Sequence, residues 1–183
     1  FCRLIHCLGY GEQDLLTLQL ESNSGTPQFW DIFGVIACCD VDHPDSTQPR
    51  KRESGLDERV KWKVKTLEAL KHRGIWLIDA SPYAIAGLGR SREGLGNKKE
   101  KESFKRIFLE EVLSEIDVGG VHSSWIIGKS VDKEIRDITP SYKGWIYQPQ
   151  GWRKSQAKYR EHLASMINDI CDNKNTTTDS GTE

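Results

Sequence analysis

The sequence has no apolar run that approaches the roughly 20 residues a membrane-spanning helix needs. Its charges nearly cancel, with 26 lysines and arginines against 27 aspartates and glutamates. The field of the whole protein therefore does not indicate nucleic acid. An apolar fraction of 37% and six tryptophans are typical of a globular chain rather than a disordered one. We expect a soluble protein with no membrane partner.

Cysteine is sparse and lacks the spacings of metal or iron–sulfur sites. The five cysteines include no Cys-x-x-Cys pair, and their number is odd: Cys2, Cys7, Cys38, Cys39 and Cys171. We interpret them as reduced thiols in a cytosol-like compartment. No two of the five histidines have the spacing of metal ligands. The sequence thus predicts a cytoplasmic (intracellular) protein without a metal or cofactor.

Apolar runs alternate with amphipathic stretches along the chain. Short apolar runs at 2–8, 75–78, 124–127 and 144–147 predict four buried strands. The segment 29–39 fits a helix or a short buried segment. Apolar residues at helical spacing predict four further helices, and Gly74 should end the first of them. The apolar residues of these four helices are Val60, Val64, Leu67 and Leu70; Phe104 to Leu113; Val131 and Ile135; and Tyr159, Leu163, Met166 and Ile170. This alternation predicts an α/β fold with three layers, α/β/α, around a short, mostly parallel four-stranded sheet.

The length fits one domain, which we place at residues 1–171, followed by a polar, disordered tail at 172–183.

Two basic clusters would suit either a phosphate backbone or solvated helix faces. Their members are Arg90, Arg92, Lys98, Lys99, Lys101, Lys105 and Arg106, and Arg153, Lys154, Lys158 and Arg160.

Four loops follow the predicted strands, at 9–14, 79–83, 128–130 and 148–153. Ligands of parallel sheets bind at the carboxyl ends of the strands. Carboxylates and an amide in these loops, with aromatic residues nearby, suit the extrusion of a nucleobase and action on it. They are Glu12, Asp14, Asp79 and Gln148, and Tyr10, Phe29, Trp30 and Trp152. Gly128-Lys129-Ser130 starts a helix after a strand, but Ser123 stands where a phosphate-binding loop has its first glycine.

The order of elements resembles the uracil-DNA glycosylase superfamily over most of the chain. Five segments match the family's first loop, stacking aromatic, base reader, third-strand end and DNA-pressing loop in turn. They are Leu8-Gly9-Tyr10-Gly11-Glu12, Gly25-Thr26-Pro27-Gln28-Phe29, Ile78-Asp79-Ala80-Ser81-Pro82, Ile127-Gly128-Lys129 and Gln148-Pro149-Gln150-Gly151-Trp152-Arg153. The chain departs from the family in three places: Tyr10 occupies the position of the acid, Asp79 that of an amide, and Gln148 that of a histidine.

The resemblance implies a DNA glycosylase that hydrolyses the N-glycosidic bond of a damaged or deaminated base. The implied catalytic residues are Glu12, with Asp14 as second choice, to align water and stabilise the cationic sugar, and Gln148 to hydrogen-bond the leaving base. The implied base-binding residues are Tyr10, Gly11, Phe29 and Asp79. The implied DNA-binding residues are Lys129, Trp152 and Arg153. An ionised Asp79 only accepts hydrogen bonds, so it favours an amino group or ring N–H over the uracil O4.

Two other functions stay open. A catalytically inactive nucleic-acid or base-binding module of the same fold is favoured by the changed first loop. A nucleotide-processing α/β enzyme would use Lys129 at its phosphate. The expected partner is DNA, single- or double-stranded, and we expect a monomer.

Overall fold

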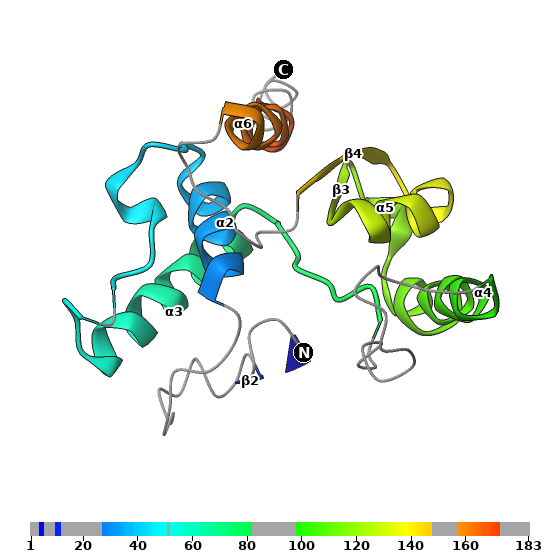
Figure 1. Cartoon of the computed structure of the whole chain (residues 1–183), viewed down its shortest axis with the longest axis horizontal. Coiled ribbons are helices and arrows are strands. Elements are labelled where there is room, and N and C mark those ends of the chain that lie inside the picture. Colours follow the sequence, from blue (N-terminus) through cyan, green and yellow to red (C-terminus); the bar gives the residue numbers. More distant parts are fainter. Residues whose placement is uncertain are drawn as a thin grey trace, which may run out of the picture. The chain divides into compact units, whose positions relative to one another are not determined.

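Figure 1 shows the computed structural model of the chain, and the residues that it describes fall into two compact units. The described residues are 4–5, 10–11, 27–50, 52–81, 98–147 and 157–172. The first unit takes the described residues up to Ile78 together with those of 157–171, and the second takes 79–147. Together they hold five α-helices and one two-stranded parallel sheet, a mixed α/β fold that is mostly helical. The predicted single domain at 1–171 stays a prediction, and residues 173–183 of the predicted tail lie outside the described residues.

The first unit is built on helices α2 (Pro27–Cys38), α3 (Leu56–His72) and α6 (Ala157–Asp172). Proline suits the first position of α2 because its missing N–H would have no partner there. Helix α2 ends at Cys38, and the next residue, Cys39, has a φ of 54°, in the left-handed region. This stretch, which the sequence left open between a helix and a short buried segment, is therefore a helix.

Helix α3 shows how the local sequence sets both ends of an element. Asp57 and Glu58 lie in its first turn and Lys71 in its last, which complements the helix dipole. Gly74 follows with a φ of 67°. Its N–H donates to the Lys71 carbonyl at 2.9 Å, and the next N–H donates to the Leu70 carbonyl at 2.9 Å. This is a Schellman ending, so the prediction that Gly74 stops the helix is confirmed.

The buried face of α3 differs from the apolar stripe that the sequence predicts. Val60 and Leu70 are buried, but Val64 is only half-buried. Lys63 and Thr66 are buried instead. The face is turned toward α2, whose residues between 30 and 37 are buried except for Asp31. Contacts with a nearly all-apolar helix thus fix the rotation of α3 and override its own pattern.

Close approach of backbones explains the packing of α2. A Cβ on Gly34 would overlap the carbonyl of Ser46 and lie 2.8 Å from the Trp62 ring. The Trp62 indole N–H donates to the Asp45 carbonyl at 2.9 Å, which ties α3 to the same loop. Trp30 meets both the Phe33 and the Trp62 rings edge-on, with centroids 5.7 and 6.1 Å apart.

The predicted reduced state of the cysteines is wrong for one pair. Cys39 and Cys171 form a disulfide, which joins the end of α2 to the last turn of α6. The odd cysteine count hid this pair, since spacing alone cannot show that residues 132 positions apart meet in the fold. Cys38 is a free, half-buried thiol.

Two of the four predicted parallel strands are corrected. Strand β1 (Leu4–Ile5) pairs antiparallel with β2 (Tyr10–Gly11), so the described part of the first apolar run pairs with part of its predicted loop and not with the parallel sheet. The run 75–78 forms no strand. Its first N–H completes the cap of α3, and Trp76 is 71% exposed. Hydrophobic side chains alone do not make a strand when no neighbour supplies a ladder.

The second unit confirms the other two predicted strands and the helix between them. Strands β3 (Ser124–Ile127) and β4 (Tyr142–Ile146) pair in parallel, with Ile127 opposite Ile146. Helix α5 (Lys129–Ile135) lies in the connection, which is longer than the roughly 12 residues a parallel crossover needs. Within the described residues the parallel sheet therefore has two strands and not four.

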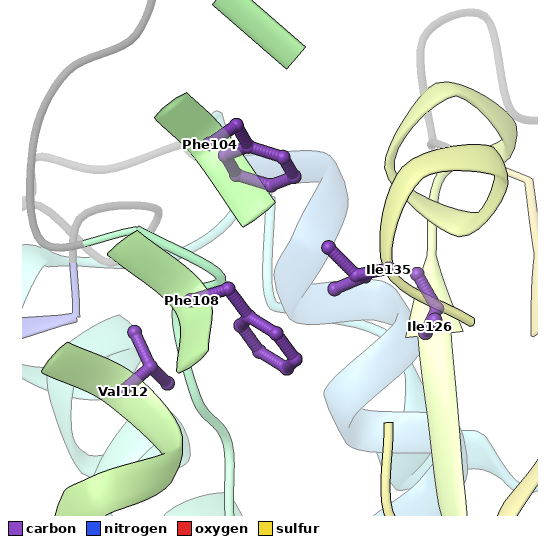
Figure 2. Packing of buried hydrophobic residues seen from close by; sticks show 5 residues of the cluster. All are labelled: Phe104, Phe108, Val112, Ile126 and Ile135. Atoms are coloured by element: carbon purple, nitrogen blue, oxygen red, sulfur yellow. The ribbon is translucent and has the colours of Figure 1, made fainter. Parts of the chain in front are cut away.

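One hydrophobic cluster holds this unit together, and Figure 2 shows it from close by. Its buried members are Phe104, Phe108, Val112, Ile126 and Ile135. Helix α4 (Lys98–Ile107) continues into a π-helical turn at Phe108–Val112. Because an α-helix has 3.6 residues per turn, side chains spaced four residues apart rotate gradually around its axis. The wider π-helical turn corrects this rotation. The π turn thus brings Val112 back onto the face of Phe104 and Phe108.

No helix in the described part of the chain is long and apolar enough to cross a membrane.

Candidate functional site at the carboxyl edge of the parallel strands

The carboxyl ends of β3 and β4 bring two chain segments together. Ile127 pairs with Ile146, and the Gly128 N–H donates to the Ile146 carbonyl at 2.8 Å. Gly128 has a φ of 111°, which turns the chain sharply into α5. Lys129 is exposed at this turn, with its Nζ 5.9 Å from the centroid of the Trp145 ring. The chain leaves β4 through Tyr147 at the same edge.

The hydrogen bond from the Gly128 N–H to the Ile146 carbonyl also concerns the alternative in which Lys129 binds the phosphate of a nucleotide. A phosphate-binding loop offers free backbone N–H groups to its ligand. The Gly128 N–H is already used within the sheet, and α5 is only seven residues long. Gly128 therefore acts as a turn residue and helix start, and its own N–H is not available to a phosphate.

A polar pair fixes α5 against the amino-terminal end of β4. The Tyr142 hydroxyl donates to Asp132 Oδ1, and Asp132 is buried. Burial, followed by this hydrogen bond, raises the pKa of Tyr142 to about 12. The tyrosine therefore stays protonated at neutral pH and keeps donating to the carboxylate. The Lys101 ammonium adds an ion pair to Glu134 at 2.9 Å between α4 and α5.

The other described site residues are not found within a single unit. Phe29 lies half-buried on α2, with its ring centroid 6.4 Å from that of Phe33. Asp79 is half-buried and follows the unpaired run 75–78, so no strand places it at the sheet edge as predicted. Phe29 and Asp79 belong to different units. Trp30 is fully buried and is a core residue.

The implied catalytic residues lie outside the described residues, as do two of the DNA-binding ones: Glu12, Asp14, Gln148, Trp152 and Arg153. Of Tyr10 and Gly11 the structure describes the backbone, which forms β2. Among the residues it does describe, no group of three metal-ligating side chains comes together.

Sequence reasoning missed a buried cationic group in the first unit. Lys63 is 1% exposed, and its Nζ lies 4.7 Å from the centroid of the Trp30 ring. Burial, followed by the charge of Arg59, lowers the pKa of Lys63 to about 8. The buried Arg59 Nε and Trp30 Nε1 have no hydrogen-bond partner in the described part of the chain. The only signal in the sequence was position, since Lys63 lies at helical spacing between Val60 and Leu67.

The basic cluster on α4 is partly neutralised by its neighbours. Lys101 pairs with Glu134 as described above, and Lys98 lies 3.8 Å from Glu102 one turn along the helix. In the second cluster Arg160 makes a two-point ion pair with Asp42, at 2.6 and 3.0 Å. These contacts favour the interpretation of both clusters, where described, as solvated helix faces.

No protein-family model, curated protein or solved structure gives a significant match to this chain.

Proposed function

We propose that this chain binds DNA through the carboxyl edge of β3 and β4, and that it removes a damaged or deaminated base by N-glycosidic hydrolysis. The observation that carries the proposal is the register of the two strands. It puts exposed Lys129 beside the exit from β4, which leads directly into residues 148–153. The resemblance assigns this loop, with Trp152 and Arg153, to DNA contact. The resemblance would bring Arg153 to the same DNA contact as Lys129, and a lysine and an arginine together suit two phosphates of a backbone.

The base-removing step depends on the resemblance alone. Glu12 would align water, Asp14 would support it, and Gln148 would hydrogen-bond the leaving base. Phe29 and Asp79 would hold the base. A four-stranded, three-layer fold of the glycosylase kind would need both 4–5 and 75–78 to extend the sheet of β3 and β4. The described structure pairs 4–5 elsewhere and leaves 75–78 unpaired. DNA binding is therefore the better supported half of the proposal, and the inactive binding module is its alternative.

DNA binding is expected to depend on Lys129 and not on Lys133. Both are exposed lysines of α5, but only Lys129 lies at the strand edge. Fluorescence anisotropy with labelled single- and double-stranded 20-mers would give the affinity at several salt concentrations. Each phosphate contact contributes about 0.7–0.9 to the slope of log affinity against log salt. We expect Lys129→Ala to reduce this slope by about one contact and Lys133→Ala to leave it unchanged. Equal slopes for both variants, or no salt-sensitive binding at low salt, would refute this site.

Base removal is tested separately with oligonucleotides that carry uracil, hypoxanthine, xanthine or a normal base. Hot alkali converts each abasic site into a strand break. Strand breaks with one base, lost in Glu12→Gln, would establish the glycosylase and name its base. Salt-sensitive binding without strand breaks for any base would select the binding module instead.

A further inference from the structure

The Cys39–Cys171 disulfide has a cation directly against one of its sulfur atoms. The Arg73 Nη1 lies 2.8 Å from the Cys39 Sγ. Arg73 is the C-cap of α3, and its N–H bonds to the Ala69 and Leu70 carbonyls, at 3.2 and 3.1 Å, fix its backbone. A guanidinium in this position stabilises negative charge on the sulfur. Cys39 is therefore the sulfur that leaves most readily as a thiolate.

The backbone at Cys39 also favours opening. Its φ of 54° lies in the left-handed region, where a residue with a Cβ is disfavoured and glycine is usual. The bond to Cys171 helps to hold Cys39 there, because it ties the residue to another helix. Both cysteines are half-buried rather than enclosed, which leaves them within reach of a small thiol.

The neighbouring Cys38 is poorly suited to attack the disulfide itself. Burial raises the pKa of the Cys38 thiol, and the charges of Asp45 and Asp40 add to the effect. The nearby cations Lys65 and Arg73 oppose it without cancelling it. Since the thiolate is the attacking species, a raised pKa makes Cys38 a poor attacker at neutral pH. Cys38 is the one free cysteine among the described residues, so we assign the attack to a thiol from outside the chain.

We propose that Cys39–Cys171 is an exchangeable disulfide that a dithiol reductant opens, and that its opening releases the covalent attachment of α6. A thiolate of the reductant attacks the Cys171 Sγ and forms a mixed disulfide. The Cys39–Cys171 bond breaks, and its electron pair leaves on the Cys39 Sγ as a thiolate beside Arg73. The second thiol of the reductant, as a thiolate, then displaces the Cys171 thiolate, which takes a proton from water. The dithiol is oxidised to a disulfide by two electrons, and the protein disulfide is reduced by two.

Opening changes what holds α6 in the first unit. Helix α6 keeps its buried residues Leu163, Met166 and Ile167 and the exposed ion pair of Arg160 with Asp42. It loses its only described covalent tie to α2.

The test is the rate of reduction by dithiothreitol under native conditions, at neutral pH. Samples are quenched with iodoacetamide, and mass spectrometry reports alkylation at each cysteine. We expect Cys39 and Cys171 to become alkylated together, and the reaction to be about tenfold slower in Arg73→Gln because the leaving thiolate has lost its cation. Arg73→Lys keeps a cation and should recover part of the rate. Arg52→Gln is the matched control, because Arg52 is an exposed arginine of the same unit.

Reduction that is as fast in Arg73→Gln as in the unmodified chain would overturn the proposal. So would a disulfide that reacts only as fast as the protein unfolds in denaturant, since it would then be a structural bond. Circular dichroism of each variant separates these outcomes from a loss of fold. If Arg73→Gln proves unfolded, the Arg73→Lys rate decides. A partial slowing relative to Arg52→Gln supports the proposal, whereas a rate equal to that of Arg52→Gln or a full tenfold slowing contradicts it.

Discussion

Replacing both Cys39 and Cys171 by serine is expected to lower the free energy of unfolding by about 4–5 kcal/mol. The disulfide closes a loop with a sequence separation of 132 residues. In the chain-entropy account, a cross-link of that length removes much of the freedom of the unfolded chain. Denaturation in urea, followed by circular dichroism without any reductant, measures the difference. Because the described disulfide lies within the first unit, the change should appear in the transition of that unit.

The matched control for this prediction is Cys38→Ser. It removes a neighbouring sulfur but leaves the cross-link in place. We expect it to change the free energy of unfolding by less than about 1 kcal/mol, as most substitutions that leave no cavity do. If Cys38→Ser and the double variant prove equally destabilised, then packing rather than the cross-link stabilises this region. A double variant as stable as the unmodified chain would show that the bond adds nothing.

Local signals in the sequence predicted several helices correctly. The end of α3 at Gly74 is confirmed, whereas the start of α2 at Pro27 was not predicted. The stripe on α6 is also correct in its centre, where Leu163 and Met166 are buried. Such signals act over one or two turns, so a single sequence contains all the information they need.

The sheet could not be predicted in the same way, because a strand depends on a partner far away in the chain. The runs 75–78 and 124–127 look alike as sequence, yet only the second is paired. The difference is that β4 follows β3 after a short crossover, while 75–78 begins inside the cap of α3. Asp79 was predicted at the sheet edge because a strand would end there, and the described structure has no strand at 75–78.

The candidate site was predicted in one part only. The sequence placed Lys129 at the end of a parallel strand, and the structure has it there. Lys63 was missed because a lysine on a helix is normally assigned to the solvent face. Only the position of α2 makes that face of α3 the buried one. The Cys39–Cys171 pair was missed for the same reason, since both depend on contacts between elements distant in sequence.

Lys63→Met is expected to stabilise the protein at pH 7 and to lose this advantage as the pH rises. The folded state lowers the pKa of Lys63 from 10.5 to about 8, chiefly by burial. Below pH 8 the amine is charged in both states, and the folded state then bears the full penalty. The pKa difference corresponds to about 3 kcal/mol, from which the lost contact with the Trp30 ring subtracts up to about 2 kcal/mol. We therefore expect a gain of about 1–3 kcal/mol for the methionine, which fills a similar volume.

The sign of the pH dependence follows from the order of the two pKa values. Between pH 8 and 10.5 the unfolded chain keeps the Lys63 proton that the folded chain has lost, so the stability of the unmodified protein rises with pH in this window. The methionine variant lacks this rise, and the difference between the two proteins shrinks toward pH 10.5. Urea denaturation of both at pH 7 and at 9.5 measures it, and taking the difference removes the titration of groups they share, including Tyr142.

Lys61→Met is the matched control, because Lys61 is an exposed lysine on the same helix. Its substitution should leave the stability unchanged at both pH values, as is usual at the surface. A destabilised Lys63→Met at pH 7 would mean that the buried ammonium is held by attraction stronger than its desolvation penalty. In that case the buried cation would stabilise the contact between α2 and α3, and the Trp30 ring, whose centroid lies 4.7 Å from the Lys63 Nζ, would be one source of the attraction.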